Sequence, residues 1–274
     1  MARRRENVPV TMGLAESGAG VAPDARHLVT ALVRGLDVLG CFRSQSLLGN
    51  QEIAQQSGLP KSTVSRLTYT LTRQGYLHYA PEIGKYRLGT AFLVLGSATL
   101  ARLDVRHLAQ PLMRDLALFA RAAVGLGVRD RLSMVCLELC RGDSAISLNL
   151  DVGSRVSLPR SAMGNAFLAV CDPAERGELL REIRDLDEVA WPRLEQRINT
   201  VLAQCENVGC ACSFGEWDDS VNAIAVGFRP GGGLPPMVLN CGGPAFTTSR
   251  EFLLGEVRPR LRAIAAQLEN SMGI

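Results

Sequence analysis

The sequence of 274 residues has few of the side chains that enzymes most often use as acids and bases. Its three histidines are His27, His78 and His107, its two lysines are Lys61 and Lys85, and neither type occurs after position 107. A hydrolase of the Ser-His-Asp or Ser-Lys type needs such a base within hydrogen-bond reach of its nucleophile. A Gly-x4-Gly-Lys-Ser/Thr phosphate loop is also missing. We therefore expect no enzymatic activity, no catalytic residue and no cofactor.

Long hydrophobic runs are missing as well. Charges or glycines interrupt each apolar stretch well before it reaches the length of a membrane span. Arg3, Arg4 and Arg5 near the N-terminus are not followed by the apolar segment of a secretory signal. With 47% hydrophobic and 21% charged residues, the composition is that of an ordinary globular protein. We expect a cytoplasmic protein with no membrane partner.

Eight cysteines are present, but no C-x-x-C pair occurs. Cys205, Cys210 and Cys212 form a C-x4-C-x-C cluster, which is a weak zinc pattern because structural zinc usually takes four ligands. In a reducing cytosol the cysteines would be free thiols, and most buried thiols act as small apolar side chains. No metal site is predicted, although the pattern leaves metal binding by this cluster open.

Positive charge is concentrated in the front part of the chain. Residues 26–87 carry eight basic and three acidic side chains, a local net charge of +5, while the whole chain carries +3. A basic segment of this kind is typical of a region that meets a polyanion. Residues 1–25 lack hydrophobic periodicity and are rich in Gly, Ala and Pro, so they predict a disordered N-terminal arm.

Residues 26–90 predict a winged helix-turn-helix DNA-binding domain. Leu28, Leu32, Leu36 and Leu39 recur at helical spacing. A second, short helix is expected over residues 51–57, with Asn50 as its N-cap and Gly58 as its stop. A third helix begins at Pro60 and ends before Gly75. Two short strands at 76–79 and 85–88 follow, joined by the turn residues 81–84.

The third predicted helix suits the major groove of DNA. Val64, Leu67 and Leu71 form its apolar stripe, and hydrogen-bonding side chains cover the other faces. A recognition helix reads bases with its N-terminal half, and arginine can bind guanine through two hydrogen bonds. A solvated surface is the alternative for all of these side chains. The predicted DNA-binding residues are Lys61, Ser62, Thr63, Ser65, Arg66, Thr70, Arg73, Lys85 and Arg87.

The segment after the hairpin is apolar nearly all round, which a solitary surface helix cannot be. We therefore expect residues 91–108 to form a linker helix that also pairs two copies of the chain. A helix continues over 104–121, with Leu108, Leu112, Leu116 and Phe119 on one face. Residues 109–274 then alternate strands and helices, which favours a mixed α/β domain of GAF or PAS type. The strands are expected at 123–128, 133–139, 145–150, 210–215, 222–228 and 237–241, and the helices at 163–170, 173–184 and 192–208.

The residues resemble the IclR family of bacterial transcription regulators. The matching stretches are LVRGLDVLGCF, GLPKSTVSRLTYTLTRQGYL and KYRLG at the front, and LPRSAMGNAFLA, VNAIAV and LNCGGPAF at the rear, in family order. The resemblance implies an α+β fold with an N-terminal winged helix-turn-helix, a linker helix and a C-terminal GAF/PAS-like effector-binding domain. It also implies a homodimer or homotetramer that binds a double-stranded DNA operator and a small-molecule effector.

The resemblance also implies effector-binding positions. Residues 161–164 match the family's turn that opens a helix toward the ligand, and a helix N-terminus offers N–H groups to a carboxylate. Some family members place an acidic or thiol side chain near Ser213 and Ala223, so the effector stays open. Trp217 and Phe214 are candidates for an aromatic pocket, with core packing as the alternative. The predicted effector-binding residues are Ser161, Ala162, Met163, Gly164, Ser213, Asn222, Ala223, Asn240 and Gly242.

These features favour a DNA-binding regulator, either a repressor or an activator. Its operator affinity is expected to change when a small carboxylic or aromatic acid binds the rear domain. A catalytic role for Ser161 is rejected because the rear domain supplies no histidine or lysine base. The alternative is a winged-helix protein-interaction module without a small-molecule effector. The local charge and the Ser/Thr/Arg-rich helix argue against that alternative.

Overall fold

The computed structural model describes residues 28–43, 45–100, 104–143, 150–231 and 233–271. The chain divides into two compact units, Met1–Arg102 and Leu103–Ile274. The expected arm over residues 1–25 and all but the last residue of the expected strand 145–150 lie outside the described residues. Within the described ranges, no helix has the length and apolarity needed to span a membrane.

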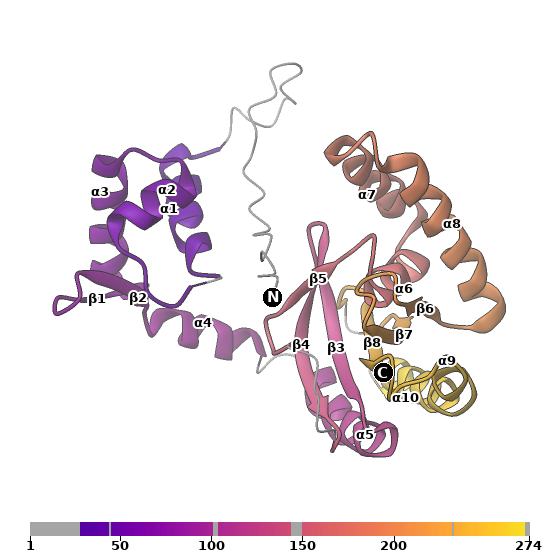
Figure 1. Ribbon diagram of the computed structural model, residues 1–274. Helices are drawn as coiled ribbons and strands as arrows, with labels where there is room; N and C mark the ends of the chain where they lie inside the picture. The colour runs from indigo at the N-terminus through magenta and orange to yellow at the C-terminus, as the bar shows by residue number, and fades with distance from the viewer. Residues whose placement is uncertain (1–27, 44, 101–103, 144–149, 232, 272–274) are drawn as a thin grey trace, which may run out of the picture. The chain divides into compact units, whose positions relative to one another are not determined.

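The N-terminal unit is a helix-turn-helix with a hairpin wing, as predicted (Figure 1). Its elements are α1 (Thr30–Gly40), the 3-10 turn η2 (Cys41–Arg43), α2 (Asn50–Ser57), α3 (Lys61–Arg73), β1 (Leu77–Ala80), β2 (Lys85–Leu88) and α4 (Ala91–Leu100). Gly58 ends α2 in the left-handed conformation at φ +68°, which favours glycine. The two strands are antiparallel, with Leu77 opposite Leu88.

One buried hydroxyl joins α2 to α3 by a hydrogen bond. Thr68 is fully buried, and its hydroxyl lies 3.0 Å from Asn50 Oδ1 and 3.0 Å from the Val64 carbonyl oxygen. The sequence predicts Asn50 as the N-cap of α2, but in the structure Asn50 is the first residue of the helix. The N-cap is Gly49, whose N–H donates to Glu52 Oε2 at 2.6 Å. A polar side chain therefore sits inside the predicted apolar side of α3.

Leu32 and Leu36 of α1, and Leu28 just before it, do not enter the core of this unit, whereas Leu39 of α1 packs against that core. Leu28, Leu32 and Leu36 are each more than half exposed, and the buried residues of α1 are Gly35 and Val38. The core consists of Val38, Phe42, Leu48, Ile53, Val64 and Leu77. An apolar helix face is therefore left on the surface of the N-terminal unit.

The C-terminal unit is built on a six-stranded sheet with the order β5-β4-β3-β8-β7-β6 and antiparallel pairing throughout. Its strands are β3 (Ala123–Asp130), β4 (Ser133–Arg141), β5 (Arg155–Ser157), β6 (Ala211–Phe214), β7 (Val221–Phe228) and β8 (Met237–Pro244). This arrangement confirms the predicted mixed α/β domain, although the short strand β5 was not expected.

Helices cover both faces of this sheet (Figure 1). The helices α5 (Asp104–Ala120) and α10 (Arg258–Ser271) pack on one face. The other face carries α6 (Ala162–Val170), with α7 (Pro173–Leu186) and α8 (Trp191–Val208) packed around it. A short helix, α9 (Arg250–Phe252), and the π-helical turn η3 (Leu253–Val257) lead into α10. Two separate apolar cores result, one on each side of the sheet.

The helix α5 buries a different face from the one that its leucines predict. Leu116 is buried and Leu112 is partly buried, but Leu108 and Phe119 are exposed. The buried face consists of Val105, Ala109, Met113, Leu116, Ala117 and Ala120. Small alanines on this face let the helix axis approach the sheet closely, which the larger leucines would prevent. The expected linker segment 91–108 contains α4 and the start of α5, which belong to different units.

An ion pair joins the start of α5 to the middle of β4. Arg106 Nε donates to Glu138 Oε2 at 2.6 Å, and Glu138 is only 6% exposed. Glu138 lies beside a shift in the β3–β4 register, where Leu126 pairs with Glu138 but the next residue, Gly127, pairs with Cys136. The first turn of α5 is thereby tied to an irregular part of the sheet.

Candidate functional sites: an exposed polar helix and a pocket

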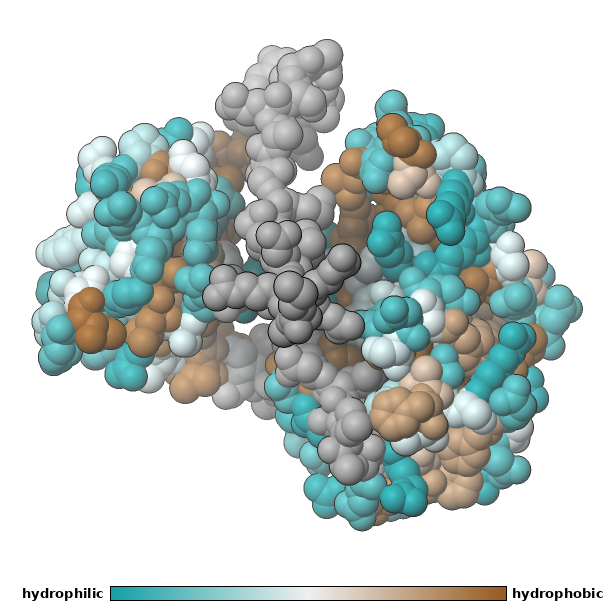
Figure 2. All heavy atoms as spheres, in the orientation of Figure 1, coloured by the Kyte–Doolittle hydropathy of each residue, from teal (hydrophilic) through white to brown (hydrophobic). Residues whose placement is uncertain are grey.

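The exposed face of α3 carries most of the predicted DNA-binding side chains, and the face of this unit shown in Figure 2 is largely hydrophilic. The exposed residues are Lys61, Ser62, Ser65, Arg66, Thr70 and Arg73, while Thr63 is half-buried. Tyr69, which the sequence analysis did not single out, is 66% exposed on the same face. Tyr69 follows Arg66, Ser65 and Ser62 by three, four and seven residues, and this spacing could have placed it on the same helix face from the sequence.

The N-terminus of α3 also offers backbone donors. The cap residue Pro60 has no N–H, and its carbonyl accepts from Val64 N at 3.0 Å. The preceding amides, those of Lys61, Ser62 and Thr63, donate to no described residue. Such free N–H groups at a helix start favour an anion, such as a phosphate of the DNA backbone.

The two basic residues of the hairpin differ in their surroundings. Lys85 Nζ contacts Glu52 Oε1 at 2.8 Å, so it ties the hairpin to α2. The pKa of Glu52 is lowered, first by the Gly49 N–H bond and then by Lys85. Arg87 is exposed. Of the two, Arg87 is therefore the better placed to meet DNA.

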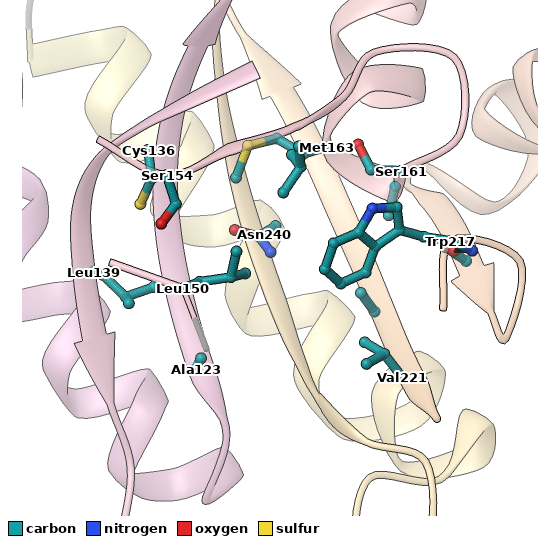
Figure 3. Close-up of a pocket in the computed structure, with 14 residues that line it drawn as sticks. Ala123, Cys136, Leu139, Leu150, Ser154, Ser161, Met163, Trp217, Val221 and Asn240 are labelled. Carbon is teal, nitrogen blue, oxygen red and sulfur yellow. Dashed lines mark hydrogen bonds between the residues drawn. The ribbon is translucent and has the colours of Figure 1, made fainter. Parts of the chain in front are cut away.

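A pocket of about 630 Å³, counting its open mouth, lies on the α6 side of the sheet (Figure 3). None of the described residues that line it carries a charge. The lining residues are Ala123, Cys136, Leu139, Leu150, Ser154, Val156, Ser161, Ala162, Met163, Ser213, Trp217, Val221, Ala223 and Asn240.

The sheet register explains why predicted residues far apart in the chain meet at this pocket. Ser213 of β6 lies opposite Ala223 of β7, which lies opposite Gly242 of β8, which in turn lies opposite Ala123 of β3. Side chains in such a cross-strand row share one face. Asn240 is two residues from Gly242 on the same strand and therefore faces the same side. The pocket floor is thus made by four neighbouring strands.

Three predicted effector residues do not line the pocket. Asn222 Nδ2 donates to the Thr248 carbonyl at 2.9 Å, so this side chain holds the loop after β8. Gly242 lies beside Ala223 on the neighbouring strand, and a Cβ added to Gly242 would come within 2.8 Å of the Ala223 Cβ. At Gly164 an added Cβ would lie 1.9 Å from the Leu158 carbonyl oxygen. These glycines shape the walls without touching the cavity.

The hydroxyl of Ser161 is fully engaged within the protein. It donates to the Ser157 carbonyl at 2.7 Å and accepts from Gly164 N at 3.0 Å, which makes Ser161 the N-cap of α6. The first two amides of α6, those of Ala162 and Met163, donate to no described residue. Ser161 therefore supports the helix start and leaves two backbone donors at the edge of the pocket.

Asn240 supplies the pocket with a polar side chain, and no hydrogen bond joins this side chain to another described residue. It lies over Gly125, where an added Cβ would come within 2.6 Å of Asn240 Oδ1. Figure 3 shows Asn240, Met163 and Trp217 pointing toward the same cavity. Ser213 Oγ accepts from Trp217 N at 3.3 Å and so helps to hold the tryptophan loop. The pocket combines apolar walls with a small set of unpaired donors.

Several lining residues were not predicted. Cys136 and Leu139 both face the pocket although they are three residues apart, because the register shift in β4 lies between them. Simple alternation along the strand does not reveal such a pair. Trp217 lines the pocket, but Phe214 lies on the other face of β6, beneath the Arg250 guanidinium at 5.1 Å. In the described part of the chain, no three His, Cys, Asp or Glu side chains are grouped so that they could hold a metal ion.

Comparisons with known proteins agree with this arrangement. A family model described as the IclR helix-turn-helix domain matches residues 31–81, and one described as the C-terminal part of the bacterial transcriptional regulator IclR matches residues 97–270. The HTH-type transcriptional regulator TsaQ1/TsaQ2 of Comamonas testosteroni is 33% identical over 261 residues, which cover 94% of this chain and 91% of that protein.

Two solved structures are also similar to this chain. An IclR family transcriptional regulator from Brucella abortus is 42% identical with a TM-score of 0.79, and the match covers 93% of this chain and 96% of that chain. An IclR homolog from Microbacterium hydrocarbonoxydans, complexed with 4-hydroxybenzoate, is 23% identical with a TM-score of 0.70 and coverages of 88% and 98%. At that identity the second match concerns the fold alone.

The close contact at Gly164 yields a stability prediction. The Gly164→Ala substitution places a methyl group against the backbone of Leu158, which cannot yield without moving α6. We expect a loss of about 3 kcal/mol in the free energy of unfolding, at the upper end of overpacking effects. Urea unfolding followed by circular dichroism measures it.

The matched control is Gly177→Ala in the middle of α7. An added Cβ there meets nothing within 4 Å, so the substitution should raise stability by roughly 0.5–1 kcal/mol through helix propensity. Equal unfolding midpoints for the two variants would show that the Gly164 contact does not constrain α6.

Proposed function

Because the chain belongs to the IclR family of bacterial transcriptional regulators, we propose that a small organic acid bound in the C-terminal pocket changes its affinity for operator DNA. The helix-turn-helix of the family supplies the DNA-binding part, and the named relatives are regulators and not enzymes. The observation that carries the proposal is the pocket itself, which joins apolar walls to unpaired N–H donors and has no charged side chain among its described lining residues. A regulator acts where the DNA is, so we place the protein in the cytoplasm.

The DNA contact that we propose is made by α3. Its N-terminal half enters the major groove, where Arg66 binds guanine through two hydrogen bonds and Ser62 and Ser65 reach bases or phosphates. The free amides at the start of α3 bind a backbone phosphate. Arg87 on the hairpin contacts the backbone beside the groove, and Lys85 has a supporting role through Glu52.

The ligand that we propose is a small carboxylic acid with an aromatic or aliphatic body. Its carboxylate accepts hydrogen bonds from the amides of Ala162 and Met163, where the dipole of α6 also favours negative charge. Its body packs on Leu139, Met163 and Trp217, and a second polar group pairs with Asn240. The 4-hydroxybenzoate bound by the Microbacterium homolog is an acid of this class.

A homodimer is the assembly that best suits these features, with a homotetramer as a pair of such dimers. The apolar faces of α1, with Leu32 62% exposed, and of α4, with Leu93 and Val94 exposed, need a cover that the described residues of the unit do not supply. A second copy covers both and presents two recognition helices to half-sites about 34 Å apart or a multiple of that. A ligand then acts by favouring one arrangement of the two copies.

The Arg106–Glu138 ion pair offers a physical link for this effect. Glu138 lies between Cys136 and Leu139, which both line the pocket, and Arg106 lies in the first turn of α5. A ligand that displaces either wall residue therefore acts on the point where the chain enters the C-terminal unit.

The first prediction concerns DNA affinity. The Arg66→Ala substitution should weaken binding to DNA from the promoter region beside the gene by roughly 1–3 kcal/mol, or about 5- to 150-fold, because a bidentate base contact is lost. Fluorescence anisotropy at several salt concentrations measures it. Arg193→Ala is the matched control, because Arg193 is an exposed helix residue of the other unit.

The salt series also distinguishes DNA binding from the alternative of a protein-interaction module. The logarithm of the wild-type affinity should fall linearly with the logarithm of salt concentration, with a slope of about −0.9 for each phosphate contact. Binding that is weak and insensitive to both salt and Arg66→Ala would contradict the DNA-binding role that we assign to α3.

The second prediction concerns the pocket. One member of a panel of aromatic and short carboxylic acids, with 4-hydroxybenzoate as the first probe, should raise the thermal midpoint of the protein. When the acid is present at a hundredfold excess over its dissociation constant, the free energy of unfolding should rise by about 2.7 kcal/mol. The methyl ester of the active acid should bind at least tenfold more weakly, because it lacks the negative charge that the α6 amides favour.

Substitutions then locate the binding site. Asn240→Leu should remove most of the thermal shift, while Asn199→Ala on the exposed face of α8 should leave it unchanged. A shift that survives Asn240→Leu and esterification would place the ligand elsewhere. If no acid of the panel changes the midpoint, the effector role of the pocket fails, and the DNA-binding role is judged on its own assay.

A further inference from the structure

Two of the three clustered cysteines lie in direct contact. The sulfur atoms of Cys210 and Cys212 are 3.9 Å apart, at the point where the chain leaves α8 and enters β6. Cys205 lies one turn before the end of α8, and the cluster holds no group of three ligands that suits a metal. The pattern that suggests zinc in the sequence is therefore a pair of thiols in the fold.

The local backbone must shift for these two thiols to join. Cys210 directly precedes β6, and its sulfur lies 3.9 Å from that of Cys212, so the sulfur atoms must approach to about 2.05 Å and the Cβ atoms to about 4 Å. Cys210 lies at the entry to β6, which is an edge strand, and the turn at Gly209 with φ +76° precedes it. An edge strand has only one neighbour, so its end can shift to bring the sulfur atoms together.

The two thiols differ in reactivity. The pKa of Cys212 is lowered, first by its hydrogen bond with Cys210 and then by the nearby Arg250 and Arg258 guanidinium groups. The pKa of Cys210 is raised, first by the same contact with Cys212 and then by burial. Cys212 is half-buried, whereas Cys210 is buried. A thiolate is the reactive form of cysteine, so Cys212 is the nucleophile of the pair.

The other cysteines provide the contrast. Burial raises the pKa of Cys136 and of Cys171 to about 11, and that of Cys241 to about 12. The pKa of Cys205 is also raised to about 12, mainly by burial. Such thiols stay protonated and react slowly.

We propose that Cys210 and Cys212 form a modification site at which a peroxide oxidises the pair to a disulfide. The Cys212 thiolate attacks one peroxide oxygen, the O–O bond breaks, and hydroxide leaves to become water, so that Cys212 carries a sulfenic acid. The Cys210 thiol then attacks the Cys212 sulfur, an S–S bond forms, the S–O bond breaks, and a second water leaves. Two thiols lose two electrons and hydrogen peroxide gains them. A small dithiol then reduces the protein disulfide to two thiols by thiol–disulfide exchange and is itself oxidised to a disulfide.

The site lies next to the pocket. Ser213 follows Cys212 on the opposite face of β6, lines the pocket and accepts from Trp217 N at 3.3 Å. A shift of β6 on oxidation therefore moves Trp217 at the pocket wall. The effect on ligand binding rests on the proposed function, but disulfide formation does not.

The test uses the full chain treated with a small excess of hydrogen peroxide, then with an alkylating reagent, and analysed by peptide mass spectrometry. We expect the peptide that contains Cys210 and Cys212 to lose two hydrogens and both alkylation sites, and dithiothreitol to restore them. Cys205→Ser should still form the disulfide. Cys210→Ser should stop at a Cys212 sulfenic acid, which dimedone traps, and Cys212→Ser should form neither product.

A second readout follows the pocket wall. In a Trp191→Phe background, Trp217 is the remaining tryptophan, and its emission should change on oxidation, return with dithiothreitol and stay constant in Cys210→Ser. The proposal is overturned if both thiols remain free to alkylate after peroxide treatment, or if Cys212 pairs with Cys205 instead. Circular dichroism confirms that each variant is folded before it is compared.

Discussion

The pocket depends on how closely α6 can approach the sheet. A side chain on Gly227 would meet the Ala166 carbonyl at 2.6 Å, and one on Gly127 would meet Met163 Sδ at 2.5 Å. Together with Gly164, which packs against Leu158 in the turn before α6, these positions let the helix approach the strands closely. Because α6 is held so near, its first amides reach the edge of a cavity whose floor carries Asn240. Loss of one of these close contacts would lift the helix and separate its donors from that floor.

The same packing defines the chemistry that the pocket can recognise. The described lining residues carry no charge, so the acid that we propose would be held by backbone dipoles and one amide side chain, and not by an ion pair. Preorganised N–H groups at the edge of an apolar pocket interact more strongly with a carboxylate than they would in bulk water. A binding mode of this kind leaves the apolar walls, above all Trp217 and Met163, to select the body of the ligand.

The sequence predicts the local features of this fold well. The stop at Gly58 and the polar face of α3 each follow from residues a few positions apart, and the structure has both. Features set by distant partners were not predictable. Lys85 pairs with Glu52, 33 residues earlier. Cys136 and Leu139 share a face because of a register shift that no periodicity shows. The leucines of α1 indicate an apolar face correctly, but a stripe does not reveal whether its cover lies in the same unit.

The most direct test of the central claim is the DNA affinity of the whole protein, measured with and without a saturating acid that binds the pocket. The account predicts that the ligand changes the dissociation constant for promoter DNA by about 5- to 150-fold, as coupling free energies of 1–3 kcal/mol produce. It further predicts that DNA changes the affinity for the acid by the same factor, because such coupling is reciprocal. An acid that binds through Asn240 and leaves the DNA affinity unchanged would contradict the account.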